Sequence, residues 1–224
     1  MATFGLIPGA GGQAWYWHRV VPLIEAAGHR AITVELPAAD DDAGLDTYAR
    51  VIEKAVGGAD DLVLIAQSMG GITAPIVADR IPVRRLILVN AMIPAPGETP
   101  GSWWTATGQD RAQRENDLRE GRDPDAPFDP LVYFLHDTPD DVTAEAMKGA
   151  PEQSGTPFGD PWPLAGWPGV PTTVLVGRDD RLFPADFQVR LAQERLGLAA
   201  EVLPGGHLIA LSRPDELTAR LLRD

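Results

Sequence analysis

The chain contains no cysteine among its 224 residues, which excludes disulfide bonds, thiolate metal sites and a cysteine nucleophile within it. Histidine is scarce too, with four residues, so candidates for a general base are few. Basic residues are in the minority, 19 against 32 acidic ones, and the formal net charge is −13. Such a chain repels nucleic-acid phosphates and anionic lipid. We therefore expect a small-molecule partner, and neither nucleic acid nor a membrane.

Long hydrophobic runs are also missing, and the first residues carry no basic leader, so the sequence predicts neither a membrane span nor a signal peptide. We therefore expect a cytoplasmic protein. A length of 224 residues with 44% hydrophobic residues suits one domain, 1–224, with a single sizeable core. The sequence does not indicate an oligomeric state.

Short apolar runs alternate with segments of helical length and pattern. The runs cover residues 4–7, 31–34, 62–65, 86–89, 172–176 and 200–203. Helical segments cover residues 20–27, 48–56, 72–80 and 214–222. Nearly continuous apolar runs are typical of strands buried on both faces. The alternation predicts an α/β fold, with a mostly parallel central sheet of about six strands flanked by helices, and ligands at the strands' carboxyl ends.

Residues 91–169 interrupt this rhythm. Proline, glycine and aspartate are dense there and no strand is indicated, although residues 109–120 and 140–148 have helical patterns. The insertion also supplies aromatic side chains, namely Trp103, Trp104, Phe128, Tyr133, Phe134, Trp162 and Trp167. A long insertion of this kind is either a lid or a decorative loop. We predict a small helical lid.

Ser68 stands where the apolar run 62–65 passes directly into the helical segment 72–80. A serine on so sharp a turn needs small residues two positions before and after it, and Ala66 and Gly70 meet this need. The alternative is that Ser68 only caps the helix. In an elbow of this kind the N–H of Met69 faces a developing oxyanion. The glycine-rich loop at residues 8–12 offers a second donor, the N–H of Ala10.

The general base and the acid that orients it are expected at the same carboxyl edge of the sheet as Ser68. Asp179 and Asp180 follow the strand at 172–176, and either carboxylate could orient a base. His207 follows two glycines after the last strand, where a flexible turn can direct its imidazole to Ser68. The remaining histidines are His18 and His29 near the first helix and His136 in the insertion. Nucleophile, acid and base then occur in the order that α/β-hydrolases require.

With these residues the sequence resembles the α/β-hydrolase superfamily over nearly the whole chain outside the insertion. Its opening resembles the plant methylesterase and hydroxynitrile-lyase branch, in Gly9, Ala10, Trp15, residues 21–23, Gly28, His29, Leu36 and Pro37. The resemblance implies the same fold and mechanism. It selects Asp180 as the acid, three residues after Gly177 and ahead of Pro184, and places Ala10 and Met69 at the oxyanion positions. Two residues depart from the family pattern: Pro8 replaces the usual histidine and Ala66 the usual glycine.

The predicted function is a serine hydrolase that cleaves a carboxylic ester, lactone or acyl thioester of a small, largely apolar substrate. The reaction proceeds through an acyl-enzyme and needs no metal or organic cofactor. The residues predicted to line the substrate pocket are Trp104, Tyr133, Phe134, His136 and Leu208. For His136 the alternative is a histidine held by Asp137 within the insertion.

Three other functions are compatible with part of the sequence. Plant hydroxynitrile lyases of this fold carry a threonine in the oxyanion loop and a lysine after the histidine, where this chain has Gly9 and Leu208, so hydrolysis is favoured. A ligand-binding module would usually have lost part of the triad. A dinucleotide-binding reductase would explain the pattern GxGxx(G/A) at residues 9–14 and Glu35 after the next strand. However, none of the three tyrosines of this chain has a lysine four residues later, so the tyrosine–lysine pair that is familiar in such reductases is missing.

Overall fold

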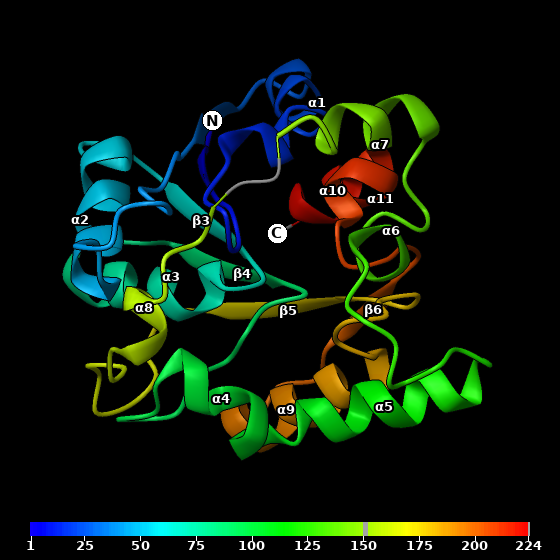
Figure 1. The fold of residues 1–224 in the computed structure, drawn as a ribbon. Helices are drawn as coiled ribbons and strands as arrows, with labels where there is room; N and C mark the ends of the chain where they lie inside the picture. The colour runs from blue at the N-terminus through cyan, green and yellow to red at the C-terminus, as the bar shows by residue number, and fades with distance from the viewer. Residues whose placement is uncertain (150–151, 224) are drawn as a thin grey trace.

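A computed structural model describes residues 1–149 and 152–223, and its centre is a six-stranded sheet (Figure 1). The strands are β1 (Thr3–Ile7), β2 (Arg30–Thr33), β3 (Leu62–Gln67), β4 (Arg85–Val89), β5 (Thr172–Gly177) and β6 (Glu201–Leu203). Their order is β2-β1-β3-β4-β5-β6, and every neighbouring pair is parallel. The predicted α/β class and six-stranded sheet are confirmed, and the six predicted runs coincide with the six strands.

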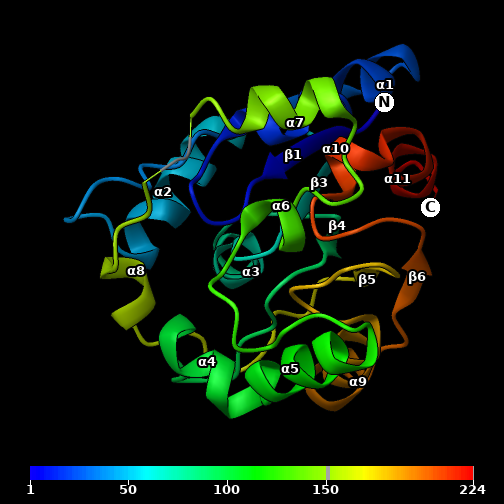
Figure 2. The same cartoon turned by 45° about the vertical axis from the view of Figure 1, so that its right-hand side comes forward.

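Both faces of the sheet are buried, which explains why the strands appear as continuous apolar runs. In β3, for example, Leu62, Leu64 and Ala66 belong to one hydrophobic cluster, while Val63 and Ile65 belong to another. This is the alternation that a pleated strand imposes. Helices α2 (Leu45–Val56), α3 (Gly70–Arg80) and α9 (Ala185–Leu196) cover the first face. Helices α1 (Val21–Ala26) and α11 (Pro214–Leu221) cover the second (Figures 1 and 2).

The order of the strands reverses direction between β1 and β3. From β1 the chain moves outward to β2, and from β3 it moves the other way through β4, β5 and β6. In open parallel sheets such a switch point opens a crevice at the carboxyl ends of the strands, where ligands bind. The glycine-rich loop after β1 and Ser68 after β3 therefore lie side by side at the switch point.

The insertion joins β4 to β5 and contains five helices among its described residues. They are α4 (Pro100–Thr107), α5 (Gln109–Arg119), α6 (Pro130–Tyr133), α7 (Asp140–Ala146) and α8 (Thr156–Gly159). Trp103 belongs to the hydrophobic cluster on one face of the sheet, whereas Leu135 and Val142 belong to the cluster on the other. Because it packs into both clusters, the insertion spans the carboxyl edge of the sheet (Figure 2).

Two tryptophans of the insertion are core residues. Trp103 and Trp162 are almost completely buried, and their indole N–H groups donate to the carbonyls of Ile93 and Ile72 at 3.0 Å. The bond of Trp162 attaches the insertion to α3, and Trp103 belongs to the hydrophobic cluster on the face of the sheet that α3 covers. Across the described part of the chain, no helix combines the length and apolar character needed to cross a bilayer.

Candidate active site

Ser68 occupies a strained backbone position between β3 and α3. Its φ is +50°, a left-handed conformation that costs a residue with a Cβ about 1–2 kcal/mol. A Cβ atom placed on Gly70 would lie 2.8 Å from the carbonyl oxygen of Pro8, and one on Gly71 only 2.2 Å from that of Met92. Only glycine fits this tight turn at both positions. The turn therefore has the geometry of a nucleophile elbow, and Ser68 remains partly exposed while its neighbours are buried.

The structure brings Ser68, His207 and Asp180 together. The Nε2 atom of His207 lies 3.0 Å from Ser68 Oγ, and its Nδ1 atom lies 2.8 Å from Asp180 Oδ2. A carboxylate can only accept hydrogen bonds, so the Nδ1 atom carries the proton. Nε2 is then free to accept the hydroxyl proton of Ser68. Because His207 and Asp180 are each only 2% exposed, little water competes for this chain of hydrogen bonds.

The two neighbouring aspartates have different contacts. Asp180 Oδ1 accepts hydrogen bonds from the N–H groups of Leu182 and Phe183 at 2.9 and 2.8 Å, and these bonds fix the carboxylate that contacts His207. The Asp179 carboxylate instead accepts the N–H of Gly205 at 3.1 Å. Of the two candidates, only Asp180 is placed to orient the histidine.

Two backbone N–H groups in the loops around Ser68 donate no hydrogen bond within the described part of the chain. They belong to Ala10 and Met69, the two predicted oxyanion donors. Their neighbours in the glycine-rich loop are already paired: the N–H of Gly12 donates to Gly9 at 3.1 Å, and that of Gly11 to Gln153 Oε1 at 2.9 Å. The N–H groups of Ala10 and Met69 are therefore available to an acceptor from outside the described chain.

Asn90 joins the acid loop to the base loop. Its Nδ2 atom donates to the carbonyls of Gly206 and His207 at 2.9 and 3.0 Å, and its Oδ1 atom accepts the N–H of Gly177 at 2.6 Å. Gln67 adds a longer bond of 3.3 Å to the His207 carbonyl. Asn90 is fully buried and has a φ of +46°. Sequence reasoning missed both residues, although a polar side chain at the carboxyl end of a buried strand was a usable signal.

The five residues predicted to line a substrate pocket lie in different surroundings. The ring of Phe134 stacks on the His207 imidazole at 5.3 Å, with 24° between the planes. Tyr133 is buried and donates to Asp117 at 2.9 Å; burial and that carboxylate raise its pKa. Trp104 packs against Trp103 and Phe183. Leu208 is partly buried against the second hydrophobic cluster.

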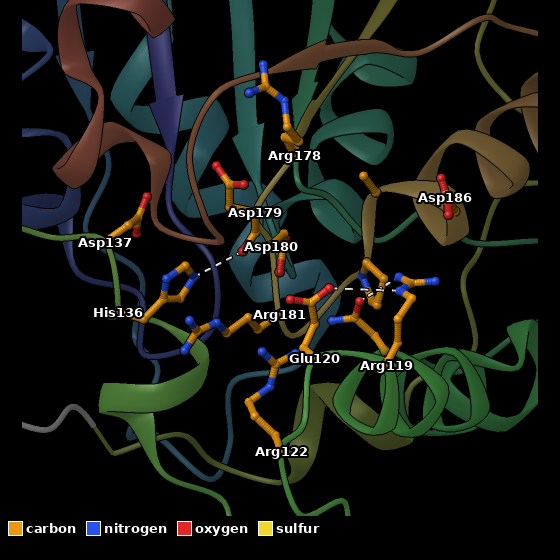
Figure 3. A pocket seen from close by; sticks show the side chains of 13 residues that line it. Arg119, Glu120, Arg122, His136, Asp137, Arg178, Asp179, Asp180, Arg181 and Asp186 are labelled. Atoms are coloured by element: carbon orange, nitrogen blue, oxygen red, sulfur yellow. Dashed lines mark hydrogen bonds and ion pairs between the residues drawn. The ribbon is translucent and has the colours of Figure 1, made fainter.

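His136 is the only one of the five that lines a cavity of about 450 Å³ among the described residues (Figure 3). Its Nε2 atom bonds to the carbonyl of Asp179 at 3.0 Å, so it is not held by Asp137 as the alternative had it. Burial and the nearby Arg181 lower the pKa of His136. The walls are charged rather than apolar, with side chains that include Arg119, Glu120, Arg122, Arg178, Arg181 and Asp186. Ser68 and His207 do not line this cavity.

Two observations on the described residues concern a dinucleotide cofactor and a metal. Glu35, which a dinucleotide would need for its ribose, accepts the N–H of Ala14 at 2.7 Å, so its carboxylate is used within the fold. Among the described residues there is no group of three or more histidine, aspartate and glutamate side chains that could hold a metal ion.

Comparison with known proteins gives consistent relatives. A family model described as the alpha/beta hydrolase family matches residues 6–221. A probable esterase of Oryza sativa subsp. indica is 34% identical over 110 residues, or 44% of this chain and 42% of the rice protein. This match therefore spans about two fifths of the relative's length. A pyrethroid hydrolase of Sphingobium wenxiniae is 29% identical over 95% of this chain and 83% of its own. The crystal structure of an Arabidopsis methylesterase, 22% identical, covers 100% of this chain and 98% of its own with a TM-score of 0.78.

Proposed function

Since the chain belongs to the alpha/beta hydrolase family, we propose that it is a carboxylic-ester hydrolase with Ser68 as its nucleophile. The observation that carries this proposal is the unbroken line of contacts from Ser68 Oγ to His207 and on to Asp180, at 3.0 and 2.8 Å. The unpaired N–H groups of Ala10 and Met69 beside the serine add to it. The printed names of the relatives, an esterase, a pyrethroid hydrolase and a methylesterase, agree with this reaction class.

Acylation begins when Ser68 Oγ attacks the ester carbonyl carbon while His207 Nε2 takes the hydroxyl proton. Asp180 stabilises the imidazolium that forms. The N–H groups of Ala10 and Met69 bind the negative oxygen of the tetrahedral intermediate. When the intermediate collapses, the bond to the leaving alkoxide breaks, and that oxygen takes the proton from His207. The acyl group remains on the serine, and the alcohol departs.

Deacylation repeats these steps with water as the nucleophile. His207 Nε2 removes a proton from the water, whose oxygen attacks the acyl carbon, and the second tetrahedral intermediate uses the same two N–H donors. The proton returns to Ser68 Oγ as its bond to the acyl carbon breaks, releasing a carboxylic acid.

Two phenylalanines beside the base suit a small, largely apolar ester. The ring centroids of Phe134 and Phe183 lie 5.3 and 5.0 Å from that of His207. The insertion at 91–169 would act as the lid over this substrate.

A lyase reaction of the hydroxynitrile type is less well supported. A Cβ atom on Gly9 would lie 2.5 Å from Gln67 Oε1 and 2.8 Å from Ser68 Cβ, so this loop position has no room for a threonine side chain. The residue after the histidine is Leu208, which cannot supply an ammonium group to bind cyanide. Both observations favour hydrolysis over the lyase.

The test is a panel of chromogenic short-chain esters, lactones and acyl thioesters, run on the parent and on Ser68→Ala. Loss of the nucleophile is expected to lower kcat on the order of a million-fold. Ser212→Ala is a matched control, because its hydroxyl is buried without a hydrogen-bond partner in the described residues. A serine-directed fluorophosphonate should label the parent and Ser212→Ala but not Ser68→Ala. Near-parent turnover by Ser68→Ala would refute the proposal.

A further inference from the structure

The loop that carries His207 has little rigidity of its own. It contains two consecutive glycines, and Gly205 has a φ of +120°, a conformation that is readily available only to glycine. The direction of the imidazole depends on these backbone angles, and a displacement of about 1 Å at a reacting group can cost roughly a hundred-fold in rate. Contacts from outside the loop must therefore hold it in place.

The carbonyl groups of the loop are held from the sheet, and its N–H groups are held by carboxylates. Asn90 binds the carbonyls of Gly206 and His207, as described above. Asp179 accepts the N–H of Gly205 at 3.1 Å, and Asp137 accepts the N–H of Gly206 at 2.7 Å. Asp137 differs from the other two holders because it belongs to the insertion, 69 residues before the glycine that it binds, and not to the sheet or to the acid loop.

Asp137 ends a run of four residues that grips the base and acid loops at three points. Besides the bond from Asp137, Phe134 stacks on the His207 ring, and His136 bonds to the carbonyl of Asp179 at 3.0 Å. The packing is tight: a Cβ atom on Gly206 would lie 2.8 Å from both Asp137 Oδ1 and His136 Nε2. Figure 3 shows His136 and Asp137 on a segment of the insertion beside the acid loop, with the hydrogen bond from His136 to Asp179 drawn as a dashed line.

We propose that Asp137 is a positioning residue for the base, through which the insertion fixes the loop that carries His207. This proposal rests on the proposed function, since it assigns the group that aims the base of that reaction. It gives the insertion a second role besides covering the substrate: the base is correctly aimed only while residues 134–137 are docked. A lid movement that undocks this segment would release the Gly206 N–H and disorganise the triad.

The experiment compares three variants of the full chain. Asp137→Ala removes the acceptor, whereas Asp137→Asn keeps an acceptor oxygen and removes the charge. Asp140→Asn is the charge-matched control, because it removes an exposed carboxylate from the start of α7, which follows residues 134–137 in the insertion. In Asp137→Ala, kcat should fall about tenfold or more while KM changes by less than about threefold, since the base and not the pocket is misplaced. Asp137→Asn and Asp140→Asn should stay within about threefold of the parent in kcat.

A second readout does not depend on activity. Hydrogen exchange at the Gly206 amide should accelerate in Asp137→Ala and remain at the parent rate in the other two variants, because only Asp137→Ala leaves this N–H without its acceptor. If Ser68→Ala kept its activity, the proposed function would fail while the exchange result still tested the contact. An unchanged Gly206 exchange rate and kcat in Asp137→Ala would overturn the inference, as would equal losses of kcat in Asp137→Asn and Asp137→Ala.

Discussion

Replacing Asn90 by alanine should damage both stability and catalysis. The substitution removes three hydrogen bonds of 2.6–3.0 Å from a fully buried side chain. The His207 carbonyl keeps its bond from Gln67, but the N–H of Gly177 and the carbonyl of Gly206 lose the side chain that pairs them. A buried polar group left unpaired costs about 1–3 kcal/mol, so the two together cost about 2–6 kcal/mol.

Two companion variants separate the causes of this loss. Alanine at a φ of +46° retains the left-handed strain of about 1–2 kcal/mol, whereas Asn90→Gly removes both the side chain and that strain. Asn90→Asp keeps the acceptor for Gly177 and loses the donor to the base loop. If the side chain positions the base, kcat should fall in all three by about tenfold or more, even where Asn90→Gly is the most stable of them.

Urea unfolding and steady-state kinetics on a chromogenic ester measure the two effects. For a domain of this size, about 1 kcal/mol corresponds to a shift of about 2–4 °C in Tm, so thermal melting is an independent check. Ile24→Val, a core change on the opposite face of the sheet from α3, controls for destabilisation alone. The reasoning would be refuted if both Asn90→Ala and Asn90→Gly kept a free energy of unfolding within about 0.5 kcal/mol of the parent and a kcat within about twofold of it.

Four further predictions follow from the same contacts. Asp180→Asn should lower kcat on the order of ten-thousand-fold, because it allows the wrong imidazole tautomer, whereas Asp179→Asn keeps its acceptor for Gly205 and should lose less than about tenfold; equal losses would contradict the assignment of Asp180. Gly9→Ala should lower kcat by roughly a hundred- to a thousand-fold, because its methyl group would press on Gln67 and Ser68; a parent-like kcat would show that the loop adapts. Gln153→Ala should lower kcat by about tenfold through the freed Gly11 N–H, and Gln153→Glu, which keeps an acceptor, should recover most of it. The pKa of His136 lies below its ordinary value of 6.5. The free energy of unfolding should therefore be greatest above pH 6.5 and fall as the pH drops through the lowered pKa. In urea unfolding at pH 7.5 and 5.5, the His136→Gln variant should lose part of this pH dependence.

The sheet was predictable because its four central strands, β1, β3, β4 and β5, are largely buried on both faces. Continuous apolar runs located all six strands, and segments of helical pattern located α1, α2, α3, α5, α7 and α11 to within a few residues. The pattern did not specify α4, α6, α8, α9 or α10. Of these, α6, α8 and α10 have four residues each and are too short for a helical period to show. Their stability comes from tertiary packing and caps, such as the capping box of Thr99 and Ser102 at α4.

The candidate site was predictable where local stereochemistry dictates the residue. Ser68, Ala66 and Gly70 form a pattern that only a sharp strand-to-helix turn requires. Asp137 and Gln153 could not be found in this way, because each contacts a loop that is distant in sequence, by 69 residues for Asp137 and by 142 for Gln153. Only the path of the insertion across the sheet edge brings them there, and that path depends on the whole fold.

Ser68 and Asn90 are equivalent positions on neighbouring strands. Their predecessors, Gln67 and Val89, pair in register, and each residue still donates its N–H to the next strand, Ser68 to Val89 at 3.2 Å and Asn90 to Leu175 at 3.0 Å. Both then turn the chain away through a positive φ. Since each such residue costs about 1–2 kcal/mol, two together persist only where surrounding contacts over-determine them. One turn presents the nucleophile and the other holds the loop of the base, so the strain at this edge is concentrated in the two residues whose placement the proposed reaction requires.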